Sequence, residues 1–248
     1  GGSQRVPSSS PADPGDRPAP AAASSAAAAS GAAAAGAAAA GVAATKEAAR
    51  REVYRRLREA GVARFPFPIE GRIPNFRGAE AAARHLRQLP AYREAAAVKV
   101  NPDAPQRPVR RAVLEDGKVL FVPTPRLQGS FFRIDPGLPP EAPARAASLS
   151  SLHRHGRPVA LTGKDPFAGL GLVVVGSVAV TRRGARVGKG EGYSDLEYAV
   201  LQELGLGLLP VVTTVHPLQI VDELPMEPHD LPVDYIVTPS GILATETP

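Results

Sequence analysis

The stretch "LVVVGSVAVTRRGARVGKGEGYSDLEYAVL", residues 172–201, places a valine-rich segment, a glycine-rich segment and a helical pattern in immediate succession. A continuous apolar run such as Leu172–Val175 is typical of a strand whose two faces are both buried. The helical pattern runs from Asp195 to Leu204. A strand that leads through a loop into a helix is the repeating unit of α/β folds, so this stretch predicts a parallel sheet covered by helices.

Strand-like and helix-like segments alternate through the rest of the chain after residue 44. We expect strands at 95–100, 118–123, 210–215 and 233–239, with a hairpin arm at 240–247 on the edge of the sheet. We expect helices at 45–60, 78–89 and 108–116, the first capped by Thr45 and ended by a left-handed Gly61. The turn-rich segment 128–165 predicts a long loop with one short helix. The predicted fold class is therefore α/β with a mostly parallel sheet.

Residues 1–44 are almost entirely Ala, Gly, Ser and Pro. These side chains bury too little apolar surface to offset the entropy of ordering the chain, so we expect a disordered tail at 1–44 and one folded domain at 45–248. An Ala- and Ser-rich, acid-poor segment ahead of a domain also resembles a transit peptide, which would place the protein in a chloroplast or another organelle. A plain linker on a cytoplasmic protein is the alternative.

The composition limits the kind of partner. The net charge of +5 suits an anionic small molecule, but the basic residues are interspersed with acidic ones, so a nucleic-acid partner is disfavoured. The chain has no cysteine, which excludes disulfides, thiolate catalysis and Cys-ligated zinc. The Ala-rich run at 25–44 is interrupted by Gly31, Gly36 and Gly41, so we expect no membrane span. Nothing in the residues indicates how many copies of the chain associate.

Gly188, Gly190 and Gly192 alternate with charged residues immediately before a helix. Alternating glycines allow successive backbone N–H groups to point into one concavity, and the first N–H groups of the helix add to it, which suits phosphate oxygens. A tight structural turn is the alternative. Ser194 and Glu197 also fit a capping box, and Asp195 could serve only to offset the helix dipole. The spacing matches neither the dinucleotide fingerprint nor the Walker loop.

Lys46 and Arg50 lie four residues apart near the expected start of the first helix and therefore share one face. Cations are disfavoured near a helix N-terminus because the dipole is positive there. A solvated face is one interpretation of this pair. An anion docked beside the helix is the other.

The motifs together resemble the 5-formyltetrahydrofolate cyclo-ligase family, the methenyltetrahydrofolate synthetases. Seven residues are in register with the family pattern G-x-R-L-G-x-G-x-G-Y-Y-D: Gly184, Arg186, Gly188, Gly190, Gly192, Tyr193 and Asp195. The segments "RIPNF", "VPTPRL", "VVVGSVAV" and "HDLPVDYIVTP" are similar to the branch named methenyltetrahydrofolate synthase domain-containing. The resemblance extends from Lys46 to the C-terminus. It implies a three-layer α/β/α fold with a mostly parallel sheet, shared with sugar-phosphate isomerases and CoA transferases.

The resemblance also implies roles for individual residues, with ATP and Mg²⁺ as cofactors and a reduced folate as the small-molecule substrate. Lys46 and Arg50 would contact the nucleotide phosphates, the loop from Arg186 to Gly192 would wrap them, and Asp195 would hold Mg²⁺. Arg126 matches the Pro-Arg pair that follows the second strand of the family and would join the nucleotide site. Arg186, Lys189 and Tyr193 would act on the reacting groups.

The chain departs from the family pattern mainly in the folate half of the site. The family's Phe and Asp before the glycine loop are Val180 and Thr181 here, and its second Tyr is Ser194. The segment "VKVNPDAPQRP" has no Glu where the family uses one to bind the pterin. Three hypotheses follow: an ATP-dependent cyclo-ligase, a non-catalytic or repurposed relative that keeps the phosphate pocket, and sugar-phosphate chemistry on the same scaffold, which rests on fold analogy alone.

Overall fold

The computed structural model describes residues 2–4, 23–124, 130–137, 147 and 152–246. The chain divides into two units, residues 1–43 and residues 44–248, and the second contains the sheet. The expected tail residues 5–22 and the nucleotide-site candidate Arg126 lie outside the described residues.

Helix α1 (Ala23–Glu59) begins 22 residues before Thr45, so two predictions are wrong: residues 23–44 are helical rather than disordered, and Thr45 caps no helix. Alanine has the highest helix propensity of all residues, and this outweighs the cost of about 1 kcal/mol for each glycine in the run. The predicted stop is confirmed, because Gly61 follows the helix with a φ of 67°. Lys46 and Arg50 therefore lie inside the helix rather than at its positive end.

The segment Ser25–Glu59 is long and apolar enough to cross a membrane by length and composition, contrary to the expectation from its glycines. Its most apolar part is not buried in the structure. Signal sequences near an N-terminus meet the same criterion, so it does not distinguish a membrane span from a targeting segment.

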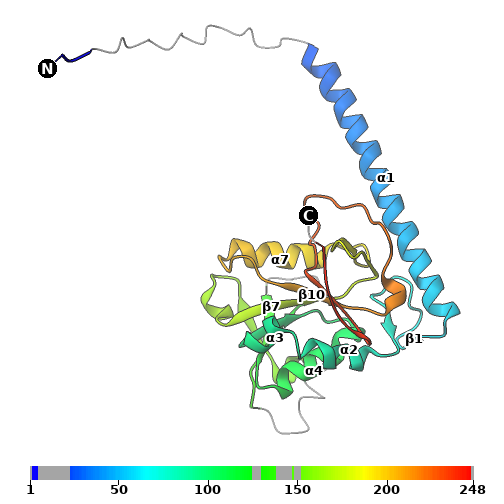
Figure 1. The fold of residues 1–248 in the computed structure, drawn as a ribbon, viewed down its shortest axis with the longest axis vertical. Helices are drawn as coiled ribbons and strands as arrows, with labels where there is room; N and C mark the ends of the chain where they lie inside the picture. Colours follow the sequence, from blue (N-terminus) through cyan, green and yellow to red (C-terminus); the bar gives the residue numbers. More distant parts are fainter. Residues whose placement is uncertain (1, 5–22, 125–129, 138–146, 148–151, 247–248) are drawn as a thin grey trace. The chain divides into compact units, whose positions relative to one another are not determined.

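The central feature of the second unit is an eight-stranded sheet with the order β12-β11-β10-β7-β3-β4-β5-β6 (Figure 1). The five strands β11, β10, β7, β3 and β4 are parallel, and the edge strands β12, β5 and β6 are antiparallel to their neighbours. The strands span Ala97–Val100 (β3), Val119–Pro123 (β4), Ser130–Ile134 (β5), Arg157–Ala160 (β6), Leu170–Val175 (β7), Val211–Thr214 (β10), Tyr235–Thr238 (β11) and Gly241–Ala244 (β12). The mostly parallel sheet predicted from the valine-rich segments is confirmed.

Helices cover both faces of the sheet and make three layers (Figure 1). One face packs against α2 (Ala79–Leu86), α3 (Pro90–Glu94) and α4 (Arg107–Glu115), through side chains such as Leu86 and Val113. The other face packs against α7 (Tyr193–Glu203), whose Leu201 is fully buried. Strands buried on both faces explain why their sequences are continuously apolar rather than alternating.

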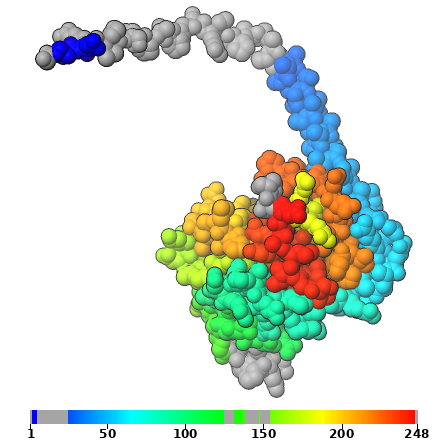
Figure 2. Space-filling view, in the orientation of Figure 1, coloured from blue at the N-terminus to red at the C-terminus, as the bar shows by residue number. Residues whose placement is uncertain are grey.

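Two small hairpins extend the second unit beside the sheet. Strands β8 (Ala179–Val180) and β9 (Arg186–Val187) pair between β7 and the glycine-rich loop, and β1 (Ala63–Arg64) pairs with β2 (Asn75–Phe76). A third apolar cluster joins the β8–β9 hairpin to the last turns of α1 through Val53 and Leu57. Figure 2 shows the yellow surface of the β8–β9 region against the red C-terminal segment. The Glu246 N–H in this segment donates a hydrogen bond to the Arg182 carbonyl.

The expectation for residues 128–165 is wrong in part. This segment contains β5 and β6 in addition to the short helix α6 (Leu152–His155). The sequence pattern conceals these strands because β6 is mostly exposed and includes Pro158, which is tolerated only at the edge of a sheet. A further helix, α3, begins at Pro90, where the pattern of α2 was expected only to end.

The order of the strands creates a switch point between β3 and β7. From β3 the chain moves through α4 to β4 on one side, whereas from β7 it moves through α7 to β10 and β11 on the other side. In open α/β sheets, ligands bind outside the carboxyl ends of the strands at such a point, because the loops separate there and leave a crevice. The residues that follow β3 and β7 are therefore the first place to look for a site.

Substitution of Gly78 tests the contact that joins α2 to the end of β11. Gly78 has a φ of 95°, and a Cβ there would lie 2.9 Å from the Cβ of Pro239 and closer still to its Cγ. We expect Gly78→Ala to lower the free energy of unfolding by ~2–4 kcal/mol, since backbone strain and overpacking both contribute. Gly61 also has a positive φ, but a Cβ there would meet only open space. Gly61→Ala should therefore lower the free energy of unfolding by only ~1–2 kcal/mol, measured by urea denaturation. Equal losses in both variants would contradict the proposed packing.

Candidate functional site

The candidate site lies at the carboxyl ends of β3, β7 and β10, where polar side chains follow the buried strands. Ser177, the second residue after β7, shares a hydrogen bond of 2.7 Å with the hydroxyl of Thr213 on β10. Thr213 in turn donates to the Val175 carbonyl. Asn101, directly after β3, donates to Ser194 on the first turn of α7. These bonds tie the strand ends and α7 together and define the rim of the switch-point crevice.

Arg186 occupies the centre of this rim and is almost fully buried. Its guanidinium donates to the Gly176 carbonyl at 2.8 Å and to the Ser177 hydroxyl at 3.3 Å, and its Nη1 lies 3.8 Å from Asp195 Oδ1. Burial lowers the pKa of Arg186, while the carboxylates of Asp195 and Asp103 oppose that shift. The side chain thus brings a fixed positive charge to the strand ends.

The glycine-rich loop folds over Arg186 and contacts α1. A Cβ on Gly188 would lie 3.0 Å from Arg186 Nη2, so glycine permits the close approach of the loop to the guanidinium. Arg50 Nε donates to the Gly188 carbonyl at 2.7 Å, and the same guanidinium lies beside Gly190. Lys189 projects from the loop with 36% of its side chain exposed, 3.5 Å from Glu191. The loop therefore collects three cations at one place.

Lys46 makes a different set of contacts from those expected of it. Its ammonium group lies 2.8 Å from Asp230 Oδ2 and 3.4 Å from Glu227 Oε1. Burial raises the pKa of Asp230, but hydrogen bonds from Lys46 and from the Glu227 N–H outweigh burial, so its pKa lies below the ordinary value. Lys46 is therefore paired with the acidic loop that carries Glu227 and Asp230. Of Lys46 and Arg50, Arg50 is the one that contacts the glycine-rich loop.

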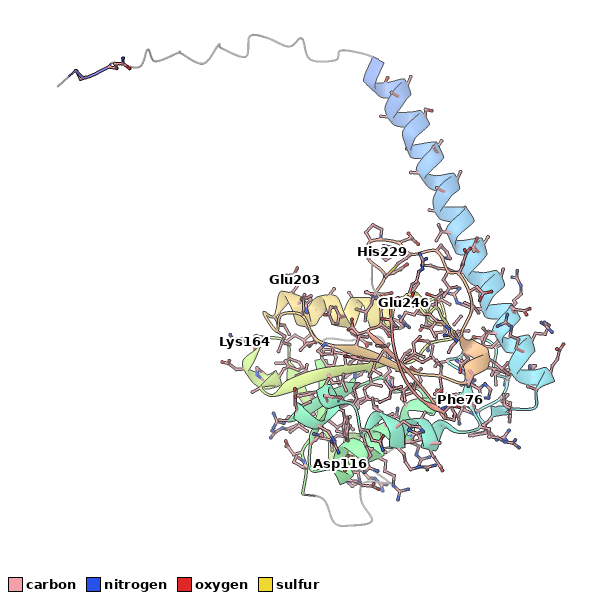
Figure 3. The ribbon with its side chains drawn as sticks, in the orientation of Figure 1. Phe76, Asp116, Lys164, Glu203, His229 and Glu246 are labelled. Carbon is pink, nitrogen blue, oxygen red and sulfur yellow. The ribbon has the colours of Figure 1, made fainter. Side chains whose placement is uncertain are left out.

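Asp195 links this acidic loop to the start of α7. Its Oδ1 accepts a hydrogen bond of 2.6 Å from the Leu231 N–H, which leaves Oδ2 as the oxygen that could bind a cation. Glu227, His229 and Asp230 also present ligand atoms within 4.8 Å of one another. Figure 3 shows the His229 ring at the surface of its loop, and the ammonium of Lys46 already contacts both carboxylates and offsets one of their two negative charges. Asp195 is therefore the better candidate for a magnesium ligand.

The capping box expected from Ser194 and Glu197 is absent from α7. The helix begins after Gly192, which is left-handed with a φ of 70° and caps without a side chain. Ser194 instead accepts from Asn101, and Glu197 is buried against Lys99 of β3 at 2.5 Å. Lys99 and Glu197 are 1% and 6% exposed, so each charge depends on the other in a medium of low dielectric. This pair fixes α7 to the sheet below the glycine-rich loop.

Asp103 is a site residue that sequence reasoning missed. Burial raises the pKa of its carboxyl, and the charges of Lys189, Arg110, Lys99 and Arg186 oppose that shift. Arg110 lies beneath this loop, 1% exposed, and holds the carbonyls of Asn101, Asp103 and Ala147. Burial lowers the pKa of Arg110 to about 10. The loop after β3 therefore presents a carboxyl group to the cations of the site.

The structure brings together most of the predicted site residues. Arg186, Gly188, Gly190, Arg50 and Asp195 are neighbours, and Lys189 and Gly192 adjoin them in the loop. Tyr193 is the half-buried first residue of α7. The missed residues are Lys99, Asn101, Asp103, Gln106, Ser177 and Glu197. The signal that could have found Asn101, Asp103 and Gln106 is a polar segment directly after a buried strand, "NPDAPQ" after "AVKV".

The comparisons with known proteins identify the family of the chain. The sequence profile described as the 5-formyltetrahydrofolate cyclo-ligase family matches residues 42–239. The methenyltetrahydrofolate synthase domain-containing protein of Mus musculus is 49% identical over 191 residues, which cover 74% of this chain and 50% of that protein. The protein of the same name from Bos taurus is 46% identical over 196 residues, covering 76% of this chain and 51% of that protein. The chain thus spans about half the length of these relatives.

A solved structure supports the fold. The NMR structure of 5,10-methenyltetrahydrofolate synthetase from Aquifex aeolicus matches with a TM-score of 0.51 at 22% identity, covering 80% of this chain and 92% of that one. The three-layer α/β/α fold implied by the resemblance is therefore confirmed.

Removal of one charge from the buried Lys99–Glu197 pair tests whether it holds α7 on the sheet. We expect Lys99→Met to lower the free energy of unfolding by about 3–5 kcal/mol, because Glu197 would be buried without its partner. The double variant Lys99→Met/Glu197→Gln should recover most of that loss, since no unpaired charge remains. Chemical denaturation measures both. Additive losses in the double variant would show that the two side chains are not coupled.

Proposed function

Because the chain belongs to the 5-formyltetrahydrofolate cyclo-ligase family, we propose that it catalyses the ATP- and Mg²⁺-dependent conversion of 5-formyltetrahydrofolate to 5,10-methenyltetrahydrofolate, or a related nucleotide-dependent reaction. The observation that carries this proposal is the convergence of Arg186, Arg50 and Lys189 on a glycine-rich loop at the N-terminus of α7. This loop lies at the switch point of the sheet, where α/β proteins bind their ligands.

The residues of the loop fit a triphosphate. Gly190 and Gly192 have φ values of 108° and 70°, and a Cβ on Gly192 would meet only open space. The eleven-residue helix α7 adds its first N–H groups, and the exposed Lys189 can move to the phosphate. Arg50 contributes a guanidinium already aimed at the loop. Lys46 joins the phosphate contacts if the nucleotide displaces Asp230 and Glu227 from its ammonium group.

Magnesium fits the carboxylate of Asp195, a hard oxygen ligand at the first turn of α7. When bound, the ion would neutralise charge on the phosphoryl oxygens. The Leu231 N–H holds Oδ1 of Asp195 in place and so orients Oδ2. Arg186, 3.8 Å from Oδ1, limits the negative charge available to the ion, so phosphate oxygens and water would complete its coordination.

The proposed reaction uses the cations of the site to offset negative charge. The γ-phosphoryl group of ATP passes to the formyl oxygen, which releases ADP. N10 then attacks the formyl carbon and loses its proton, and the phosphate departs with the formyl oxygen as the ring closes. Arg186, Lys189 and Arg50 would stabilise charge on the transferring group. Tyr193 adjoins the same loop and would orient the reacting group through its hydroxyl.

A second candidate function is supported by a specific observation. Where the family has Phe and Asp ahead of the loop, this chain has Val180 within β8 and Thr181 bonded through its hydroxyl to the Ala185 N–H. These residues serve the hairpin instead of the substrate. A non-catalytic or repurposed relative, which keeps the phosphate pocket and binds another ligand or a protein partner, accounts for this change.

The two candidates differ in product formation and in the response to Asp195→Asn. The cyclo-ligase should form the methenyl product from 5-formyltetrahydrofolate with ATP–Mg²⁺, followed by its absorbance. Asp195→Asn keeps the Oδ1 acceptor for Leu231 and so should cost no more than ~1 kcal/mol of stability. It should abolish the Mg²⁺-dependent part of ATP affinity in calorimetry, since Mg²⁺ prefers anionic oxygen.

Three results distinguish the interpretations. Nucleotide binding without product selects the non-catalytic candidate. An unchanged Mg²⁺ increment in Asp195→Asn removes the magnesium role of this residue. The absence of both nucleotide binding and product formation in the wild-type chain contradicts the proposed function.

A further inference from the structure

Ser194 carries a hydroxyl proton that the protein itself does not use. Its Oγ accepts a hydrogen bond of 2.9 Å from Asn101 Nδ2. An amide nitrogen is only a donor, so the Ser194 proton cannot point back to it. Among the residues that the structure describes, no group accepts a hydrogen bond from this hydroxyl. Ser194 is half-buried at the second position of α7, so the proton can reach a ligand.

The buried ion pair beneath Asn101 fixes the orientation of its amide group. The Lys99 ammonium donates to Asn101 Oδ1 at 2.6 Å, and Glu197 compensates its charge. Because an ammonium group has no acceptor, it must face the amide oxygen, which turns the amide nitrogen towards Ser194. The ion pair therefore makes Ser194 an acceptor towards the protein and leaves its proton for the site.

The backbone of Asn101 is held as firmly as its side chain. Its N–H donates to the Val174 carbonyl of β7 at 3.1 Å, and its carbonyl accepts from the buried Arg110 at 2.7 Å. Only 5% of Asn101 is exposed. A donor that is oriented before its ligand arrives loses little conformational entropy on binding. The arrangement therefore suits a hydroxyl that binds a ligand in one fixed direction.

The neighbours of Ser194 determine which ligand its proton suits. Arg50, Arg186 and Lys189 bring positive charge to the adjoining glycine-rich loop, and the first N–H groups of α7 have no acceptor within the helix. The nearby Asp195 carboxylate lies 3.8 Å from Arg186 Nη1, which offsets its charge. A ligand here must supply several anionic acceptor oxygens, as a phosphate group does.

We infer that the Ser194 hydroxyl donates a hydrogen bond to a phosphate oxygen of the ligand in the glycine-rich loop, and that Asn101 and Lys99 are positioning residues for this bond. The inference rests on the proposed function, under which the phosphate belongs to ATP. The family pattern has a tyrosine at this position, so the pattern does not supply this contact. A free polyphosphate offers the same oxygens, and the test therefore includes both sources.

The first test removes and restores the hydroxyl. Calorimetry measures the affinity of the full chain for ATP–Mg²⁺ and for inorganic tripolyphosphate. Ser194→Ala should weaken binding of the phosphate ligand about tenfold, the effect expected for a hydrogen bond to a charged group, and Ser194→Thr should stay within about threefold of wild type. Ser240→Ala makes the same truncation at an exposed serine between β11 and β12, and should change neither affinity.

The second test separates positioning from a general loss of structure. Asn101→Leu removes both amide contacts at nearly constant volume, and should weaken binding about threefold or more because the Ser194 hydroxyl is no longer oriented. In the Ser194→Ala background the same substitution should change affinity by no more than about twofold, since no hydroxyl remains to position. Thermal melts establish that each variant is folded. The Ser194 variants decide the phosphate contact even where Asn101→Leu does not fold.

The outcomes separate this inference from the proposed function. Folate turnover together with wild-type ATP affinity in Ser194→Ala overturns the inference and leaves the function in place. A Ser194-dependent affinity for tripolyphosphate, in a chain that neither binds ATP nor forms product, supports the phosphate contact and removes the function. Equal losses from Asn101→Leu with and without the Ser194 hydroxyl overturn the positioning role. Equal losses in Ser194→Ala and Ser194→Thr overturn the hydroxyl contact.

Discussion

The buried guanidinium of Arg186 joins the parts of the structure that the site requires. It contacts the carbonyl at the end of β7, the hydroxyl that connects β7 to β10, and the first turn of α7. A buried positive charge is stable only when hydrogen bonds and opposite charges compensate its loss of water. The Gly176 carbonyl and the Ser177 hydroxyl at the end of β7, together with the carboxylate of Asp195, provide that compensation, and this fixes their positions around the guanidinium.

Glycines allow this cluster to be compact. At Gly176 the absence of a side chain brings Asp103 and Gln106 against the end of β7, and at Gly188 it brings the loop against Arg186. The cations gathered by these approaches are balanced in part by carboxylates: Lys99 by Glu197, and Lys46 by Asp230 and Glu227. Lys189 and Arg50 face the loop with weaker or exposed carboxylate partners. Positive charge is therefore most available where phosphate would bind.

Sequence reasoning reached the parallel sheet and the glycine-rich loop because both leave strong local signals. A continuous run of valines is typical of a strand that is buried on both faces. Alternating glycines before a helix allow backbone conformations that other residues rarely adopt, and so mark a loop of unusual geometry. The partners of Lys46 could not be predicted, because residues 227–230 reach it only through the tertiary fold. Glu197 was interpreted as a cap because local spacing cannot show that Lys99 lies opposite. Strand β6 was missed because an exposed edge strand with a proline has no periodic pattern.

Hydrogen exchange at the backbone amides of residues 188–195 tests most directly whether the loop around Arg186 binds a nucleotide. These N–H groups lie in the loop and in the first turn of α7, where hydrogen bonds to phosphate would protect them. The account predicts that ATP–Mg²⁺ slows exchange at residues 188–195 and at few positions beyond the switch point. Unchanged exchange in this segment at a saturating nucleotide concentration, or protection confined to another surface, would contradict it.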